Sequence, residues 1–402
     1  MGKEGAIDAL PGKLVGMAND RGGSDNVTAI MIRALAGEAP EGDTTRFTGP
    51  AQNQGMAALF LGLNRNKRSL VLDLKQQGAK DALWRLIATA DVLVHSIRPQ
   101  KVEKLGFAPD TVMPRHPRLI YTALTGYGSG GAYAGQPAYD DVIQGQSGIA
   151  ALMTGVTGEP RYAPMIIGDK TCGLVAAQAI TAALLARERT GNGQYVEIPM
   201  LETMAAFTLA EHMYGATFDP PKGAMGYSRV LAPWRRPYKT GDGYVAMLVY
   251  TNPQWRRFWK LVGKEPLGND PRFATMAARA DNIAVVYRIA GECMLERTTD
   301  AWLAVLGEAE IPSARVRSLD ELLGDEHLAS VGFFQRRRHP SEGAIVMPSP
   351  PARFGAAPSA IERLQPRLGE HSLEILREAG YSPAEIAQLI AAKATLVDAT
   401  EN

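Results

Sequence analysis

Residues 118–131 read RLIYTALTGYGSGG, a strand-like apolar run that ends in a glycine-rich turn. Two similar runs precede it, SLVLDL at 69–74 and DVLV at 91–94, and apolar residues recur at helical spacing over 83–90 between them. Strands separated by helices of this length are typical of crossover connections, so we predict an α/β fold with a mainly parallel sheet. Such sheets place ligands at the carboxyl ends of their strands, where this turn lies. Glycines there are equally typical of ordinary loop geometry.

A long apolar segment from about Thr171 to Arg189 follows. Its apolar residues cover nearly every face until Arg187, so we expect a helix that is buried through most of its length. Residues 191–193 (GNG) end it, and residues 194–198 (QYVEI) predict a further strand.

Composition indicates where the chain divides. Residues 215–240 are rich in Pro, Gly and isolated aromatic residues, which is typical of a domain crossing, and a second proline-rich stretch spans 348–358. We expect a large domain over 41–215, a small domain over 225–330, and a linker with a helical tail over 331–402, with residues 1–40 as a separate N-terminal segment.

Bulk properties exclude several classes of protein. The 402 residues carry a formal net charge of +1, whereas a dedicated nucleic-acid binder normally carries a basic excess. Cys172 and Cys293 lie in no CxxC or Cys/His cluster, so we expect neither a disulfide framework nor a metal site. The first twenty residues lack a signal-peptide core, and no apolar run approaches a membrane span. We therefore predict a cytoplasmic protein without nucleic-acid or membrane partners.

Asp169 precedes the predicted start of the long helix. One interpretation is an N-cap, in which the carboxylate accepts backbone N–H bonds that the first turn leaves unsatisfied. The other is a nucleophile, because the helix dipole holds a carboxylate ionised at this end and a substrate carbonyl could reach it. Without a resemblance to a known family, the cap is the favoured interpretation.

Other charged residues are less distinctive. Asp140 and Asp141 are adjacent, so they point in different directions and do not form an acid/base pair of the glycosidase kind; a solvated helix start explains them equally well. Basic side chains fall near the ends of the predicted strands, where an anionic ligand would meet them. These are Arg46, Arg65, Lys67, Arg68, Lys75, Arg98, Lys101 and Lys104.

Several ordered motifs resemble those of the class III CoA-transferases, the family of formyl-CoA:oxalate and carnitine CoA-transferases. The similarity spans about residues 40 to 385, and this many motifs in order would not recur by chance. The motifs are NRNKRS at 64–69, LDLK at 72–75, ADVLV at 90–94, Arg98-Pro99, Tyr139-Asp140, Gly168-Asp169, DGY at 242–244 and DPRF at 270–273.

This resemblance implies a chemistry. In the family, the aspartate matching Asp169 attacks the acyl-CoA carbonyl to give a mixed anhydride, and the released thiolate then forms an enzyme–CoA thioester that the acceptor acid resolves. It implies acyl-CoA and small carboxylic acids as substrates, with no permanently bound cofactor and no metal. By analogy, the loop 126–131 could supply donors to the developing oxyanions.

The resemblance also implies a CoA site and an assembly. Ser96 stands where many members have Asn, and Lys104 stands where some have Arg. Lysine keeps the positive charge of arginine but cannot bind a phosphate in a bidentate manner. The implied fold is a Rossmann-like large domain with an inserted smaller α+β domain, a tail that returns to the large domain, and an interlocked homodimer. The implied CoA contacts are Arg46, Leu72, Lys75, Ser96, Arg98, Lys104 and Tyr139, with Asp140 near the reacting centre.

The first forty residues do not share the resemblance. Family members begin with a strand and helix that form part of the CoA-binding domain, whereas residues 21–30 (RGGSDNVTAI) resemble the last strand of a 2C-type metal-dependent phosphatase. The other metal-binding carboxylates of such phosphatases have no counterpart, so we expect no phosphatase activity. We hypothesise that this N-terminus is replaced or misassembled. Either the missing strand leaves a sheet edge exposed and weakens CoA binding, or residues 26–33 take its place.

Two other functions stay open. A 2-methylacyl-CoA racemase shares the implied fold but uses a histidine where this chain has Tyr139, and a tyrosine with a pKa of roughly 10 is poorly matched to α-proton abstraction. The other is a CoA-binding or merely dimerising remnant that the unusual N-terminus has impaired.

Overall fold

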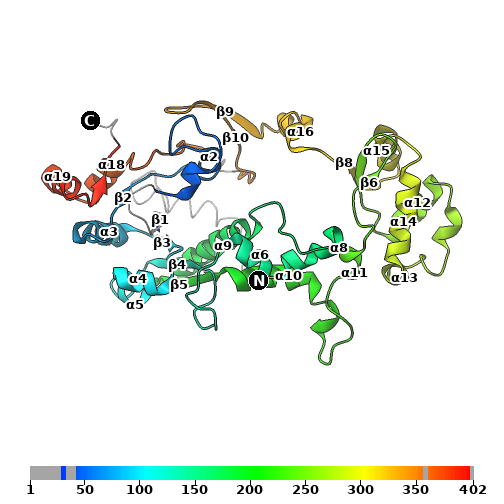
Figure 1. The fold of residues 1–402 in the computed structure, drawn as a ribbon, viewed down its shortest axis with the longest axis horizontal. Coiled ribbons are helices and arrows are strands. Elements are labelled where there is room, and N and C mark those ends of the chain that lie inside the picture. Colours follow the sequence, from blue (N-terminus) through cyan, green and yellow to red (C-terminus); the bar gives the residue numbers. More distant parts are fainter. Residues whose placement is uncertain (1–28, 33–41, 356–360, 399–402) are drawn as a thin grey trace, which may run out of the picture. The chain divides into compact units, whose positions relative to one another are not determined.

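Figure 1 shows the computed structural model of the chain, which describes residues 29–32, 42–355 and 361–398. The chain divides into two compact units. The first unit comprises the residues up to 139, 168–203 and those from 326 onward, and the second comprises 140–167 and 204–325. Residues 140–167 and 204–215 thus group with the second unit, although the sequence division assigned them to the large domain. One link between these two segments is Thr208, whose methyl carbon would lie 3.8 Å from a Cβ at Gly148.

The first unit is built on a parallel sheet in the order β1-β3-β4-β5. Its strands are β1 (Ala29–Ile32), β3 (Val92–His95), β4 (Ile120–Thr125) and β5 (Gln194–Pro199). Val92 pairs with Ala29 on one side and with Ile120 on the other. The side chains of β3 and nearly all of those of β4 are buried, as expected of strands covered on both faces. The predicted α/β fold with a parallel sheet is confirmed.

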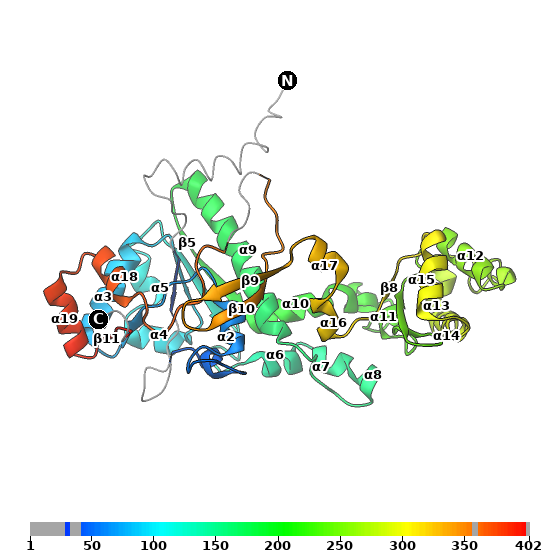
Figure 2. The same cartoon turned by 90° about the horizontal axis from the view of Figure 1, so that it is seen from above.

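Helices cover both faces of this sheet (Figure 2). On one face, apolar side chains of α3 (Gln77–Thr89), α4 (Pro99–Leu105) and α5 (Pro109–Val112) pack with Leu93 and Tyr121. On the other face, Ala183 of α9 (Ile167–Thr190) packs with Val92 and Ile120. The sheet is therefore the middle of three layers, and the ends of β3 and β4 emerge between them.

Strand β1 decides between two expectations for the N-terminal region. Residues 29–32 pair with β3 over four positions, so the outer edge of β3 is occupied. The strand expected over residues 26–33 is confirmed for 29–32. Residues 26–28 and 33, like the other N-terminal residues before 42, lie outside the described residues.

The run at 69–74 forms a strand with an unexpected partner. Only β2 (Val71–Leu72) is extended, and it pairs antiparallel with β11 (Thr395–Leu396) in a separate two-stranded sheet. The prediction that this run joins the parallel sheet is wrong. The physical reason is the C-terminal tail, because α18 (Ser372–Glu378) and α19 (Pro383–Ala391) bury apolar residues against α3 and the β2 segment (Figure 1).

Helix α9 is less buried than its composition predicts. Its buried residues are Gly168, Cys172, Ala176, Ala183 and Arg187, whereas Leu174 is 74% exposed. The expectation of a helix buried through most of its length is therefore wrong for the chain by itself.

Further elements complete the two units. The first unit also holds η1 (Thr44–Phe47), α2 (Ala58–Leu63), α17 (Glu326–Ser330) and the hairpin of β9 (Phe334–His339) and β10 (Gly343–Pro348). Helix α10 (Met200–His212) belongs to the first unit as far as residue 203 and to the second beyond it.

The second unit has its own core around Phe258, Trp259 and Trp302, all at most 1% exposed. It contains a three-stranded antiparallel sheet of β6 (Tyr238–Lys239), β7 (Tyr244–Met247) and β8 (Ser313–Arg315). Its helices are α6 (Asp140–Gln146), α7 (Ile149–Leu152), α8 (Thr154–Thr157), η2 (Tyr214–Thr217), α11 (Ser228–Leu231), α12 (Asn252–Leu261), η3 (Glu265–Gly268), α13 (Met276–Asp281), α14 (Ile283–Met294), α15 (Thr299–Glu308) and α16 (Leu319–Leu323).

A membrane-spanning helix and a metal site each place requirements on the described residues. None of their helices is both long enough and apolar enough to cross a membrane. They also hold no group of three or more His, Cys, Asp or Glu side chains suited to a metal ion.

Candidate active site

Asp169 lies in the first turn of α9, on an exposed position. The helix begins at Ile167, about four residues earlier than the sequence predicts, so the interpretation of Asp169 as the N-cap is wrong. Inside the first turn the carboxylate still meets the positive end of the helix dipole, which favours its ionised form. The structure therefore presents this carboxylate at an exposed position of the first unit, next to the buried Gly168.

The glycine-rich loop after β4 is held by two carboxylates. The backbone N–H of Gly128 donates to Glu202 Oε1 at 2.9 Å, and that of Ser129 donates to Glu197 Oε1 at 3.0 Å. The Ser129 hydroxyl donates to Glu197 Oε2 at 3.0 Å. A Cβ at Gly128 would lie 2.5 Å from Glu202 Oε1, so a larger residue there would displace the end of the Glu202 side chain from this bond.

These bonds reduce the number of backbone donors that the loop 126–131 could offer to an oxyanion. Two of the donors that the resemblance assigned to an oxyanion already bind protein carboxylates, so the N–H groups of Gly128 and Ser129 are not open to a substrate in this arrangement. Neither Glu197 nor Glu202 is among the site residues that the sequence predicts. Glu197 did leave a signal, since it is a lone carboxylate within the strand QYVEIP.

Three expected CoA contacts lie just beyond the end of β3. Ser96 is exposed, Arg98 is half-buried and immediately precedes α4, and Lys104 is exposed in the last turn of α4. Leu72 on β2 packs against the apolar cluster that includes Ile97. The structure thus brings Leu72, Ser96, Arg98 and Lys104 into one region of the first unit.

His95, at the end of β3, is fixed in one tautomer by its bonds. The Tyr121 hydroxyl donates to the Phe107 carbonyl at 2.7 Å, so its remaining partner, His95 Nε2 at 2.9 Å, carries the proton and donates to it. His95 Nδ1 accepts the Ile97 N–H at 3.1 Å. The imidazole is therefore neutral, and its burial lowers its pKa from 6.5 to about 4.

The depressed pKa predicts a pH dependence of stability. Because the unfolded chain binds a proton more readily, this group's full contribution is present above pH 6.5 and is lost as the pH falls toward about 4. The loss reaches about 3 kcal/mol of unfolding free energy. Urea titrations between pH 7 and 4 measure this loss as the difference between the wild type and His95→Asn. The comparison is needed because carboxylates titrate over the same pH range and lower the stability of both proteins. We expect a shallower decline for the variant, and parallel declines would contradict the assignment.

Arg46 is used by the fold itself. It is 4% exposed, its guanidinium donates to the Pro366 carbonyl from both terminal nitrogens at 3.2 Å, and it lies 3.9 Å over the Phe60 ring. Burial lowers its pKa to about 10, so the side chain remains a cation at neutral pH. A cation committed to carbonyls and an aromatic face stabilises this segment whether or not a ligand is bound.

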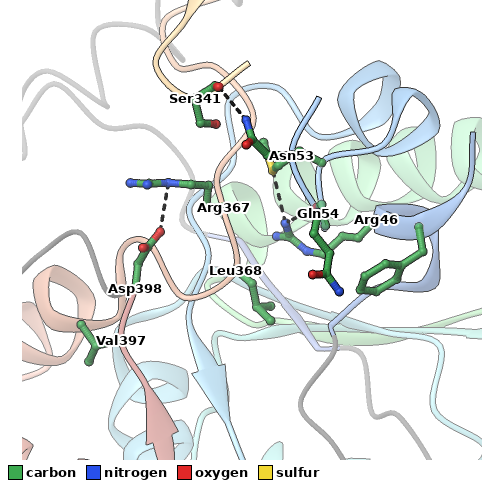
Figure 3. A pocket seen from close by; sticks show the side chains of 11 residues that line it. Arg46, Asn53, Gln54, Ser341, Arg367, Leu368, Val397 and Asp398 are labelled. Atoms are coloured by element: carbon green, nitrogen blue, oxygen red, sulfur yellow. Dashed lines mark hydrogen bonds and ion pairs between the residues drawn. The ribbon is translucent and has the colours of Figure 1, made fainter. Parts of the chain in front are cut away.

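Arg46 also lines a cavity of about 670 Å³ in the first unit (Figure 3). Asn53 bridges to the Ser341 carbonyl at 2.8 Å, and Arg367 Nε lies 3.0 Å from Asp398. The other lining residues are Phe47, Gln54, Gly55, Met56, Leu368 and Val397. Of the expected CoA contacts, only Arg46 borders this cavity.

The remaining expected residues lie elsewhere. Lys75 is exposed just after β2, and Tyr139 is 78% exposed. Asp140 belongs to the second unit, where it is 9% exposed and accepts a bond from Gln144 Nε2 at 2.6 Å. Gln144 in turn accepts the Ala163 N–H at 2.9 Å. Asp140 therefore helps to order the segment that leads into α9.

Comparisons with known proteins give this geometry a context. The chain is 29% identical over 358 residues to a probable fatty acyl-CoA transferase of Mycobacterium tuberculosis, covering 86% of this chain and 90% of the relative. It is 30% identical over 353 residues to a succinate–glutarate CoA-transferase of Agrobacterium fabrum, covering 85% and 87%. A crystal structure of a CAIB/BAIF family protein from Brucella suis matches 88% of this chain and 92% of its own, with a TM-score of 0.69 and 27% identity. The sequence model of CoA-transferase family III matches residues 37–372. The chain therefore belongs to CoA-transferase family III and is a CoA-transferase.

Proposed function

We propose that this enzyme moves CoA from an acyl-CoA donor to a small carboxylic acid through covalent intermediates on Asp169. The observation that carries the proposal is the exposed carboxylate in the first turn of α9, at the position that matches the family's nucleophile. A helix N-terminus keeps this carboxylate ionised, as a nucleophile must be.

The steps balance without water, metal or ATP. An Asp169 oxygen bonds to the acyl carbonyl carbon as the carbon–sulfur bond breaks, which gives a mixed anhydride and CoA thiolate. The thiolate attacks the aspartyl carbonyl and releases the donor acid, leaving an Asp169–CoA thioester. The acceptor carboxylate attacks that thioester and expels CoA thiolate, which gives a second mixed anhydride between Asp169 and the acceptor. The thiolate then attacks the carbonyl carbon of the acceptor, which forms the product acyl-CoA and releases the Asp169 carboxylate. Each step exchanges one activated acyl group for another of comparable energy.

The region beyond β3 is the proposed CoA site. CoA carries phosphates, and Arg98 and Lys104 place cations on one side of the apolar cluster that includes Leu72. Ser96, Arg46, Lys75 and Tyr139 complete the proposed set of contacts, with Asp140 near the reacting centre.

The proposed assembly is a homodimer. An apolar residue such as Leu174, 74% exposed on the helix that carries Asp169, supports a second copy of the chain as the surface that covers α9. The mass of the enzyme in solution, measured by light scattering, tests this. A monomer at micromolar concentration would rule it out.

Trapping with hydroxylamine tests the proposed function. Incubation with an acyl-CoA and hydroxylamine should convert Asp169 to a hydroxamate, 15 Da heavier by the arithmetic of replacing OH with NHOH, and peptide mass spectrometry locates it. Acetyl-, succinyl- and butyryl-CoA serve as donors. An unmodified Asp169, together with α-proton exchange into the acyl group in deuterated water, would point to a racemase instead.

A further inference from the structure

The segment between β3 and α5 is anchored at both ends by one buried pair of side chains. At its start, His95 Nδ1 accepts the Ile97 N–H, and at its end the Tyr121 hydroxyl donates to the Phe107 carbonyl. The 2.9 Å bond between His95 Nε2 and the Tyr121 hydroxyl joins the two anchors. Residues 97–107 therefore form an arch. Its first foot, Ile97, is bonded to His95 of β3, and its second foot, Phe107, is bonded to Tyr121 of β4.

The anchoring pair is rigid. His95 is 3% exposed and Tyr121 is 0% exposed, and their rings meet edge to face with centroids 5.3 Å apart. Tyr121 sits in the middle layer of the unit, held by the pairing of β4 with β3 and β5. Neither side chain has room to change rotamer without breaking a buried bond, which would leave a polar group unsatisfied.

The arch carries the charges that the proposed CoA site needs. Arg98 and Lys104 lie on it, Ser96 lies between His95 and its first foot, and Val102 and Phe107 fasten it to the apolar cluster beneath. A shift at the start of the arch displaces Ser96 and Arg98, and a shift at its end displaces Lys104, which the short helix α4 links to Arg98.

His95 is unsuited to a direct chemical role. Both ring nitrogens are occupied by bonds to the protein, and the ring is buried, so it neither takes nor gives a proton to a substrate. Its contribution must pass through the arch.

We infer that His95 and Tyr121 are positioning residues for coenzyme A: their buried bonds hold the arch in the conformation in which Ser96, Arg98 and Lys104 meet the ligand. This rests on the proposed function, because it takes those three residues as CoA contacts. The inference concerns binding rather than the chemical step at Asp169.

Calorimetry with free CoA tests the inference on three variants. Tyr121→Phe keeps the ring and removes the hydroxyl that joins the anchors, His95→Leu removes both nitrogens, and His95→Asn keeps an acceptor near the place of Nδ1. We expect Tyr121→Phe and His95→Leu to raise the Kd for CoA about 5- to 30-fold, with His95→Asn closer to the wild type. The kcat at saturating acyl-CoA should change by less than about 3-fold, because only binding is affected.

The neighbouring Thr122→Val variant is the matched control. Thr122 lies on the same strand, is 0% exposed, and its hydroxyl has no hydrogen-bond partner within the part of the chain that the structure describes. Removing this hydroxyl should leave the Kd for CoA unchanged. Circular dichroism establishes that each variant is folded, and hydrogen exchange of the 97–107 amides should accelerate in Tyr121→Phe but not in the control.

The outcomes separate the two proposals. If the wild type fails to bind CoA, the proposed function falls and takes this inference with it. If the wild type binds CoA and Tyr121→Phe binds as tightly as Thr122→Val, only the positioning role is overturned. A lower Tm with an unchanged Kd would likewise reduce the pair to a structural feature and overturn the inference.

Discussion

Replacing Asp169 with asparagine should lower the transfer rate by at least about 10³-fold while leaving the affinity for CoA within about 2-fold of the wild type. Asparagine has nearly the same shape and is tolerated in the first turn of a helix, but its amide is not a nucleophile. The loss should therefore appear in kcat and not in CoA binding. Steady-state transfer assays and calorimetry with free CoA measure the two quantities.

Two further variants make this result specific. Asp169→Ala guards against activity that returns by deamidation of the asparagine. Asp110→Asn removes another first-turn carboxylate of the first unit, at the start of α5, and should leave the rate unchanged within about 2-fold. Equal losses of transfer rate in Asp169→Asn and Asp110→Asn would show that the charge at a helix end is what matters. A fully active Asp169→Ala would exclude Asp169 as the nucleophile.

Replacing Arg187 with methionine should lower the free energy of unfolding by about 2–3 kcal/mol. The Arg187 side chain is 6% exposed, and its Nη2 lies 2.8 Å from Asp91 Oδ1, while its Nη1 donates to the Arg118 carbonyl at 3.2 Å. Methionine fills the space but removes both donors. Asp91 is still 26% exposed, so water relieves part of the penalty, and the expected loss lies at or just below the lower end of the roughly 3–5 kcal/mol typical of a broken buried pair.

Urea denaturation with matched variants tests this role of Arg187. Arg189→Met removes an exposed cation from the same last turn of α9 and should change stability by less than about 0.5 kcal/mol. Lysine at 187 should recover part of the loss, since it keeps the charge but not the two-pronged geometry. The double variant with Asp91→Asn should be clearly less destabilised than the sum of the single ones, because the two side chains share one bond. Strict additivity would contradict the pairing.

The strands of the sheet were predictable because their signal is local. The sequence predicts strands at 91–94, 118–124 and 194–198, which are rich in β-forming residues and bounded by turns. The structure has strands at 92–95, 120–125 and 194–199. The run at 69–74 has the same composition, but its partner is a strand at 395–396 that no local pattern indicates. The start of α9 was misplaced because Asp169 resembles a cap, although a first-turn aspartate is equally at home there.

The site was only partly predictable for a similar reason. The resemblance points to Asp169 and to the basic residues after β3, since those motifs are contiguous. Glu197 and Glu202, which hold the glycine loop, lie 68 and 74 positions from the residues they bind. His95 lies 26 positions from Tyr121 and reads as an ordinary strand end. Such pairs exist only once the sheet has formed.

Helix α9 connects the proposed nucleophile to a buried ion pair. It carries Asp169 in its first turn and Arg187 in its last, and at about 1.5 Å per residue these positions are roughly 27 Å apart along the axis. Because α9 is a single continuous helix, a small tilt at the end where Arg187 binds Asp91 produces a larger displacement of the Asp169 carboxylate at the other end. A random-mutagenesis screen scored by turnover alone would therefore recover Arg187, Asp91 and Asp169 as one class. Dividing each turnover by the folded fraction of the variant would separate the stabilising pair, Arg187 and Asp91, from the proposed nucleophile Asp169.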